Sequence, residues 1–441
     1  MNKKKPGLSI GSILVLCLTA AVAVGCVFMF GKMRSQDANA MMDAERMRGL
    51  MDSFMKSPTS EPEPQSTAQT VTITLAPVII TPPPVTGKPA ASPTPNTQAN
   101  DLSHSFSLTA GGLMSFQSDI SDTVYNKTDK TVDYIPVVSM ISGKIYADMN
   151  LVTFPQVLNV ADHKYGDYLV PVEAAVAIRA CRFDNVVLGT EHILDQGEQG
   201  AVDTVSSLSG IGMICEGVNA GVYSQNRVVQ LNGGRIAILS YTDSLTPKGK
   251  NTLSGQEGLM RLYSEETVRK DILTARGQGA RCVIVCMYWG NENTVSVTTS
   301  MRKTATALAQ MGADVILGSQ PLRVLPMEII STVDENGKPR DTFVAYSLGT
   351  FLSESRDAYA ISGILLHMNI RSDQNGRLHF ESIEYTPTYI WRQKVNGRVQ
   401  YRVVCSADPA PEDMSDQQRD VMGRALTRIQ NILKDSPITQ R

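Results

Sequence analysis

The chain has few histidines and lacks the short motifs that mark several common catalytic sites. Only five histidines occur in 441 residues, and of these only His192 lies in a polar loop after a strand-like segment. A metal centre built from several imidazoles is therefore excluded. The sequence has no P-loop, no H-E-x-x-H helix, no Cys-x-x-Cys pair, and no G-x-S-x-G turn between a predicted strand and a helix. These absences argue against P-loop nucleotide binding, zincin-type proteolysis, dithiol redox chemistry and serine-hydrolase chemistry.

The charge balance and the cysteines exclude two further classes of protein. The formal net charge is −2 and the pI is about 6.3, so no basic field indicates a nucleic-acid partner. The seven cysteines are scattered through apolar segments, which is not the pattern of a disulfide framework. Cys282 and Cys286 could suggest a metal pair, but alternation along a buried strand predicts two small core residues instead.

The amino terminus carries an apolar run preceded by lysines. Leu8 to Phe30 is 23 residues long and contains no charge. A run of about 20 apolar residues spans a bilayer, whereas the apolar part of a cleaved signal peptide is about 7–15 residues long. The sequence therefore predicts a retained transmembrane helix within residues 1–34, with the amino terminus in the cytoplasm and the rest of the chain outside the cell. The alternatives are a cleaved signal and lipidation at Cys26.

Two segments connect this anchor to the globular part of the chain. Residues 35–56 carry methionines and other apolar residues at helical spacing, which fits a self-association helix and equally a marginal surface or interfacial helix. Residues 57–104 are rich in Pro, Thr, Ser and Ala and predict an extended, disordered linker. A domain at 105–405 and a C-terminal helix within 406–441 complete the predicted organisation.

From about residue 106 the sequence alternates between strand-like and helix-like segments. Helices are expected at 172–180, 202–208, 301–311 and 412–434, and buried strands at 185–189, 235–241, 282–287, 314–317 and 342–347. Segments 364–370 and 378–385 predict a hairpin around Gly376. Polar loops at the carboxyl ends of such strands are where an open α/β sheet usually builds its site.

The loop after the strand at 185–189 contains Glu191, His192 and Asp195. His192 could act as a general acid or contact a phosphate, because its pKa lies near neutrality. The alternative is a loop histidine that hydrogen-bonds Asp195 or the backbone. Asp195 with Gly197 could simply shape the turn into the next helix.

The loops after two later strands supply the other candidates. Tyr288 and Trp289 could stack on a sugar or line a polymer groove, or they could pack at the strand end. Glu292 is open to the same two interpretations. Arg323 could bind a carboxylate or phosphate through two hydrogen bonds, or it could be a solvated loop arginine.

Several motifs occur in a fixed order between residues 106 and 404. They are Gly111 to Met114 (GGLM), Asn150 to Val152 (NLV), Phe183 to Gly197 (FDNVVLGTEHILDQG), Tyr288 to Glu292 (YWGNE), Gly318 to Leu322 (GSQPL), Tyr346 to Phe351 (YSLGTF) and Tyr385 to Tyr389 (YTPTY). Together they resemble the CapA family of poly-γ-glutamate capsule proteins, which has GDIM, NLE, FDVVSLANNHxxDxG, HWGxE, GHHPH and YSLGNF at the first six places.

The resemblance implies a fold and a degenerate metal site. The fold would be α+β, a four-layer αββα sandwich of the calcineurin-like metallophosphatase type. Family metal-site side chains are replaced here at Gly112, Val152, Thr190, Glu191, Tyr288, Ser319, Gln320, Leu322 and Thr350. The framework glycines, prolines and aromatics remain, so we expect a fold that has lost its metal chemistry. We assign no metal ligand and no cofactor; at most, one divalent ion would be held weakly.

The resemblance also implies a function at a bacterial cell membrane. We expect a binding or scaffolding role in the synthesis, export or anchoring of an anionic envelope polymer of the poly-γ-glutamate type, with other membrane biosynthesis proteins as partners. The alternatives are a divergent metal-dependent hydrolase or transferase and a purely structural member of a membrane complex. The candidate catalytic residues are His192, Asp195, Glu191 and Glu292, and the candidate ligand-binding residues are Trp289, Tyr288, Arg323 and Asn150.

Overall fold

A computed structural model describes residues 104–441, except for 167, 222–227, 232–233, 334–336, 338, 374–375 and 396. The predicted transmembrane run, the helix at 35–56 and nearly all of the linker at 57–104 lie outside these residues. Within the described part of the chain, no helix has both the length and the apolar character needed to cross a bilayer.

The first of two large sheets contains nine strands in the described chain, and seven of them lie in the order β18-β17-β16-β1-β4-β7-β8. These are β1 (His104–Met114), β4 (Met149–Thr153), β7 (Asn185–Val187), β8 (Ile214–Glu216), β16 (Ser362–Ser372), β17 (Leu378–Val395) and β18 (Arg398–Cys405). β15 (Thr350–Leu352) pairs with β1, and β19 (Thr439–Gln440) pairs with β17. The β1, β4, β7 and β8 strands are parallel to one another, whereas β16, β17 and β18 form antiparallel hairpins.

The second sheet has the order β13-β14-β12-β11-β10-β9. Its strands are β9 (Val228–Leu231), β10 (Gly234–Thr242), β11 (Ala280–Tyr288), β12 (Val315–Ser319), β13 (Met327–Val333) and β14 (Pro339–Ala345). Apolar side chains such as Leu108 and Ile364 from the first sheet pack against Ile284 and Phe343 from the second. The two sheets therefore lie face to face around one shared core.

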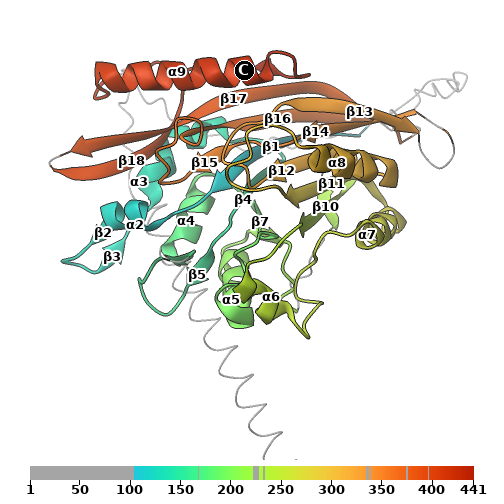
Figure 1. Ribbon diagram of the computed structural model, residues 1–441, viewed down its shortest axis with the longest axis horizontal. Helices are drawn as coiled ribbons and strands as arrows, with labels where there is room; N and C mark the ends of the chain where they lie inside the picture. Colours follow the sequence, from blue (N-terminus) through green and yellow to red (C-terminus); the bar gives the residue numbers. More distant parts are fainter. Residues whose placement is uncertain are drawn as a thin grey trace, which may run out of the picture.

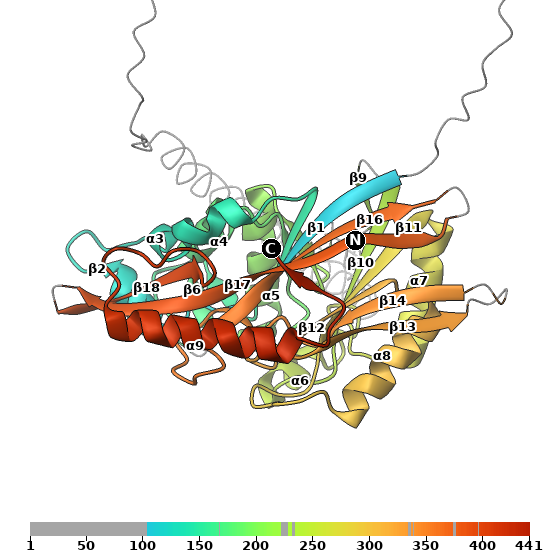
Figure 2. The ribbon, with the colours of Figure 1, turned by 90° about the horizontal axis from the view of Figure 1, so that it is seen from above.

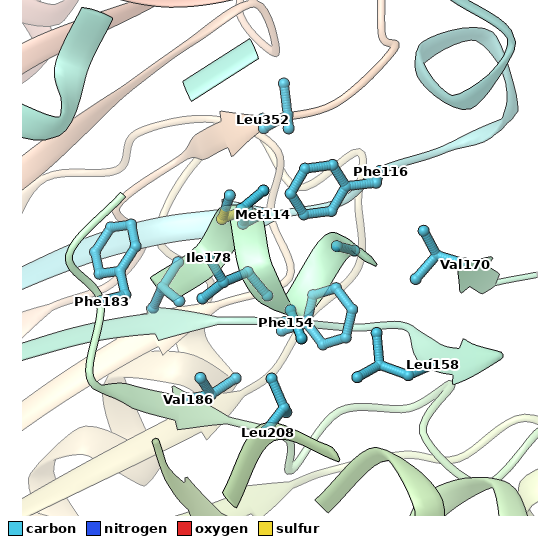
Figure 3. Packing of buried hydrophobic residues seen from close by; sticks show 14 of the residues in the cluster. Met114, Phe116, Phe154, Leu158, Val170, Ile178, Phe183, Val186, Leu208 and Leu352 are labelled. Atoms are coloured by element: carbon cyan, nitrogen blue, oxygen red, sulfur yellow. The ribbon is translucent and has the colours of Figure 1, made fainter. Parts of the chain in front are cut away.

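Helices cover the outer faces of both sheets (Figure 1). The first sheet is covered by α3 (Ile135–Val138), α4 (Glu173–Ala180) and α5 (Gly197–Gly210), and the second by α7 (Glu265–Gly277) and α8 (Thr299–Met311). The core under α4 and α5 contains Phe116, Phe154 and Phe183, which Figure 3 shows gathered with Ile178 and Leu208. The layers thus follow the order helix, sheet, sheet, helix, and the mixed α/β architecture expected from the sequence is confirmed.

The remaining elements lie at the ends and edges of these layers. They include α2 (Ser118–Val124), β2 (Tyr125–Asn126), β3 (Thr131–Val132), the 3₁₀ helix η1 (Ser139–Lys144), β5 (Val157–Asn159), β6 (Leu169–Pro171), α6 (Pro247–Leu253) and α9 (Asp416–Leu433). The last helix lies along β17, as Figure 2 shows, and buries Met422 and Ala425 against Trp391.

The predicted strands at 185–189, 235–241, 282–287, 314–317 and 342–347 correspond to β7, β10, β11, β12 and β14. Along β11, Cys282 and Cys286 face the first sheet, whereas Val283 and Val285 face the helices. This alternation confirms that both cysteines are core residues. The predicted hairpin is longer than its sequence pattern, because β17 continues to Val395 and pairs there with β18.

Candidate functional site

Loops that follow parallel strands of the two sheets lie close together where these strands end. A Cβ atom on Gly189 would overlap the hydroxyl of Ser240, so glycine lets the end of β7 approach β10 this closely. The strands β10, β11 and β12 are parallel neighbours. The loops after these three strands therefore lie beside the loop that follows β7.

His192 lies among these loops, between two carboxylates. Its Nδ1 is 2.8 Å from Asp195 Oδ2, and its Nε2 is 3.1 Å from Glu191 Oε1. Burial lowers the pKa of the imidazole, but the hydrogen bonds to Glu191 and Asp195 outweigh burial and raise the pKa above its usual value. In the charged form both ring nitrogens donate, so His192 has no free lone pair with which to act as a base.

Tyr168 covers one face of this imidazole. The two rings are stacked, with 3.4 Å between their centroids and 8° between their planes. The Tyr168 hydroxyl donates to Glu292 Oε1 at 3.2 Å, which links the β11 loop to the β7 loop. Burial, together with the charge of Glu292, raises the pKa of the phenol, so it remains a hydrogen-bond donor at neutral pH.

The two carboxylates beside His192 have further partners. The hydrogen bond with His192 lowers the pKa of Glu191 against the opposing effect of burial, and smaller contributions come from Gln320 and Ser244. Asp195 also accepts a hydrogen bond from the Thr246 hydroxyl. Both carboxylates are thus hydrogen-bonded to side chains of the surrounding loops.

The phenol of Tyr288 and the carboxylate of Asp243 also lie beside these residues. Tyr288 is only 3% exposed, and burial and the neighbouring carboxylates raise its pKa well above the usual value. Burial also raises the pKa of Asp243, whose carboxylate accepts the Gly290 N–H at 3.2 Å. We refer to the whole group as the strand-end cluster, which consists of Tyr168, Glu191, His192, Asp195, Asp243, Tyr288 and Glu292. Four carboxylates and one imidazolium make this cluster anionic.

The structure thus brings together five of the eight sequence candidates, namely Glu191, His192, Asp195, Tyr288 and Glu292. Asp243 was not among the sequence candidates, although it lies two residues after the predicted strand at 235–241 and could have been found by the same rule as His192. Tyr168 gave no such signal in the sequence, because it precedes α4 and does not follow a predicted strand. Its backbone is left-handed, with φ at 61°.

Trp289 does not face the strand-end cluster. Its side chain is 2% exposed and packs in the core between the second sheet and its helices. The indole Nε1 donates to the Tyr346 carbonyl oxygen at 3.0 Å, and the two rings are stacked with 5.9 Å between centroids. The interpretation of Trp289 as a stacking surface for a ligand is corrected accordingly, since the indole is a packing residue.

Arg323 and Asn150 are also directed elsewhere. The Arg323 guanidinium lies 3.5 Å from Asp357 Oδ2 and 4.5 Å from the centroid of the Tyr359 ring, so it is already engaged. Asn150 lies near the beginning of β4, where its Nδ2 donates to Asp184 Oδ2 at 3.2 Å. Because β4 and β7 are parallel, this pair lies at the amino-terminal ends of the two strands, whereas the strand-end cluster lies beyond the carboxyl end of β7.

The residues at the expected metal positions do not fit a two-metal centre. A Cβ atom on Gly112 would overlap the carbonyl oxygen of Gly349 and lie 2.9 Å from its carbonyl carbon, so an aspartate has no room there. Ser319 and Gln320 place neutral side chains where the resemblance expects histidines. Across the residues that the structure describes, no group of three or more His, Cys, Asp or Glu side chains could hold a metal ion.

A model of a known protein family matches most of the described domain. The family model for the bacterial capsule synthesis protein PGA_cap matches residues 107–355. The chain belongs to this family. The match begins in β1 and includes every loop of the strand-end cluster, so the family domain and the candidate site coincide.

Curated relatives come from several bacteria. The chain is 23% identical to the PGA biosynthesis protein CapA of Bacillus subtilis over 78% of this chain and 82% of that protein. It is 23% identical to the capsule biosynthesis protein CapA of Bacillus anthracis over 46% of this chain and 47% of that protein. A probable polyglutamine synthesis accessory protein of Mycobacterium tuberculosis is also 23% identical, over 53% of this chain and 63% of that protein.

Among solved structures, the chain is similar to the NAD nucleotidase NadN of Haemophilus influenzae. The TM-score is 0.40 at 12% sequence identity, and the alignment covers 77% of this chain and 57% of that chain.

Proposed function

We propose that this protein is a membrane-anchored, extracellular accessory protein that binds or scaffolds an anionic envelope polymer of the poly-γ-glutamate type. The names of the relatives, which refer to capsule, PGA and polyglutamine synthesis, support the process. The closed position at Gly112 carries the non-catalytic part of the proposal, because the backbone of Gly349 occupies the space of a metal-binding aspartate. We infer a metallophosphatase-type fold whose metal site has degenerated.

The state of His192 supports the same conclusion. A general base needs a free lone pair, and a general acid must be able to give up its proton near the working pH. Here both imidazole nitrogens face carboxylates, and the pKa of the ring is raised. The imidazolium therefore serves to hold the loops after β7 and β11 together, through Glu191, Asp195 and the stacked Tyr168.

Metal analysis and a thermal scan of the purified full-length protein test this proposal. We expect no stoichiometric Mn, Fe or Zn, no metal-stimulated hydrolysis of generic phosphomonoesters or diesters, and the same melting temperature with and without EDTA. An ion present at 100 times its dissociation constant would add about 2.7 kcal/mol to the free energy of unfolding. A clear loss of stability in EDTA would therefore overturn the proposal of a degenerate site.

A divergent metal-dependent hydrolase or transferase is the second candidate function. It is favoured by the placement of the Glu191 and Asp195 carboxylates on either side of one imidazole, since carboxylate oxygens suit a hard divalent cation, although the described residues form no three-ligand group. In this case the Glu292→Gln variant should lose a metal-stimulated activity that the wild type possesses. Absence of that activity from the wild type would remove this candidate.

The anchor is tested separately from the site. We expect the full-length protein to sediment with membranes, and protease added to intact cells to release the domain by cutting within residues 57–100. A secreted product that begins near residue 30 would contradict a retained membrane anchor.

A further inference from the structure

A groove of about 480 Å³ lies far from the strand-end cluster, between two hairpins at one end of the molecule. One wall comes from α2 and the β2–β3 hairpin, and the other from β17 and β18. Figures 1 and 2 both place β2 and β18 at this end and α7 at the opposite end. The floor includes the ring of Tyr401, which is 3% exposed, and the side chain of Val399.

The charged residues that line this groove are mostly basic. Lys127, Arg356, Arg392 and Arg398 face Asp119 and Asp122, which leaves two more cations than carboxylates. The whole chain has a net charge of −2, so this concentration of positive charge is local. We refer to this region as the basic groove.

The two acidic residues are already bound within the protein. Asp119 Oδ2 lies 3.2 Å from Arg356 Nη2, and Asp122 accepts a hydrogen bond from the Tyr165 hydroxyl. Asp119 is thus paired with Arg356, whereas Asp122 is bonded only to a neutral hydroxyl, so among the described groove residues three cations and one carboxylate remain outside an ion pair.

Three cations therefore remain available to a ligand. Among the residues that the structure describes, Lys127, Arg392 and Arg398 have no carboxylate within ion-pair distance. Arg392 is oriented by Tyr401, since its Nε donates to the Tyr401 hydroxyl at 3.3 Å and its guanidinium carbon lies 5.9 Å from the ring centroid. This orientation leaves the terminal nitrogens of Arg392 free to donate into the groove.

We propose that the basic groove is the binding site for a polymer that carries a carboxylate on each repeating unit. This inference rests on the proposed function, because that function supplies an anionic polymer. A guanidinium matches a carboxylate through two parallel hydrogen bonds, and the three available cations come from three separate segments, so they can hold successive carboxylates of one chain. The strand-end cluster is itself anionic and repels such a ligand.

The test is a binding titration of full-length protein in detergent with poly-γ-glutamate, a phosphodiester polymer and neutral dextran, at two salt concentrations. The groove variant is Arg392→Gln/Arg398→Gln. The matched control is Arg269→Gln/Lys270→Gln on α7, which removes the same charge from exposed positions at the opposite end of the molecule. Thermal unfolding of both variants checks that the fold is retained.

We expect the wild type to bind poly-γ-glutamate more tightly than the other two polymers, and more weakly at high salt because surface ionic contacts are screened. The groove variant should bind it about tenfold more weakly, and the control within about twofold of wild type. If the wild type binds poly-γ-glutamate and the groove variant binds it equally well, the groove assignment is overturned while the proposed function stands. Preference for the phosphodiester polymer overturns the carboxylate assignment, and failure of the wild type to bind any polymer overturns both proposals.

Discussion

The imidazole of His192 lies parallel to the phenol ring of Tyr168, with 3.4 Å between the ring centroids. The contact joins the loop after β7 to the segment before α4, and the Tyr168 hydroxyl extends the link to Glu292. Because the imidazole is also held by Glu191 and Asp195, its protonation state should affect the stability of this whole edge of the molecule.

Deprotonation of His192 should therefore weaken the fold as the pH rises. The pKa of His192 in the folded protein is raised above 6.5 by Glu191 and Asp195 despite its burial. Its contribution to stability is fully present below the unfolded pKa and is lost as the pH rises through the folded pKa. The difference in free energy of unfolding between wild type and His192→Gln should thus shrink as the pH rises above 6.5 and through the raised pKa of the folded protein. An NMR titration midpoint for His192 below that of a free histidine would contradict this expectation.

His367 should show the opposite pH dependence. Its ring lies between the hydroxyls of Thr109 and Thr386, at 3.1 and 3.0 Å, and burial, with a smaller effect of Arg441, lowers its pKa to about 4. The unfolded chain then binds a proton that the folded one does not, so stability is lost as the pH falls from about 6.5 to 4, by roughly 3 kcal/mol.

Urea unfolding of wild type and His367→Gln at several pH values measures this effect, because the carboxylates common to both proteins cancel in the difference. Equal losses of stability in the two proteins over this range would show that His367 does not titrate as expected.

Replacement of Trp289 by Phe should destabilise the domain without affecting ligand binding. The change removes the donor to the buried Tyr346 carbonyl, and an unpaired buried carbonyl costs about 1–3 kcal/mol. Denaturant unfolding measures the loss, and the poly-γ-glutamate titration described above should give the wild-type affinity. A variant of normal stability with weakened binding would instead place Trp289 in a ligand site.

Introduction of the family aspartate at position 112 should disrupt the fold rather than create a metal site. The Cβ atom would overlap the Gly349 carbonyl, and a change of this kind typically costs about 1–3 kcal/mol or more. Gly143→Asp is the matched control, because a Cβ atom there meets nothing within 4 Å. If Gly112→Asp folds with normal stability and acquires a divalent metal, the proposal that position 112 is closed to a metal ligand is overturned.

The central strands of the second sheet, and β7, β16 and β17 of the first, could be predicted because their burial shows in the local pattern of apolar residues. The β11 run from Cys282 to Met287 is apolar on both faces, since one face meets the other sheet and the other face meets α7 and α8. The helix α7 was not predicted, although Ser264 caps its first turn and Val268, Ile272 and Ala275 form its buried face. Because its few apolar residues lie among many charged ones, the helical periodicity of the segment is weak.

The site was harder to predict, because side-chain direction at a strand end depends on packing between distant segments. Tyr288 and Trp289 are adjacent in sequence, yet the first belongs to the strand-end cluster and the second lies in the helix-covered core. Arg323 could not be assigned for a similar reason. Its partners Asp357 and Tyr359 come from a loop more than thirty residues later in the chain.

The long strand β17 has a consequence for how this protein can diversify. The family match ends at residue 355, and Arg356, Arg392 and Arg398 all follow that point, on the loop before β16 and on the β17–β18 hairpin. Three of the groove's four cations thus lie beyond the residues matched by the family model. Under the proposed groove assignment, substitutions at these three positions would change polymer binding while leaving the loops around His192 unaltered.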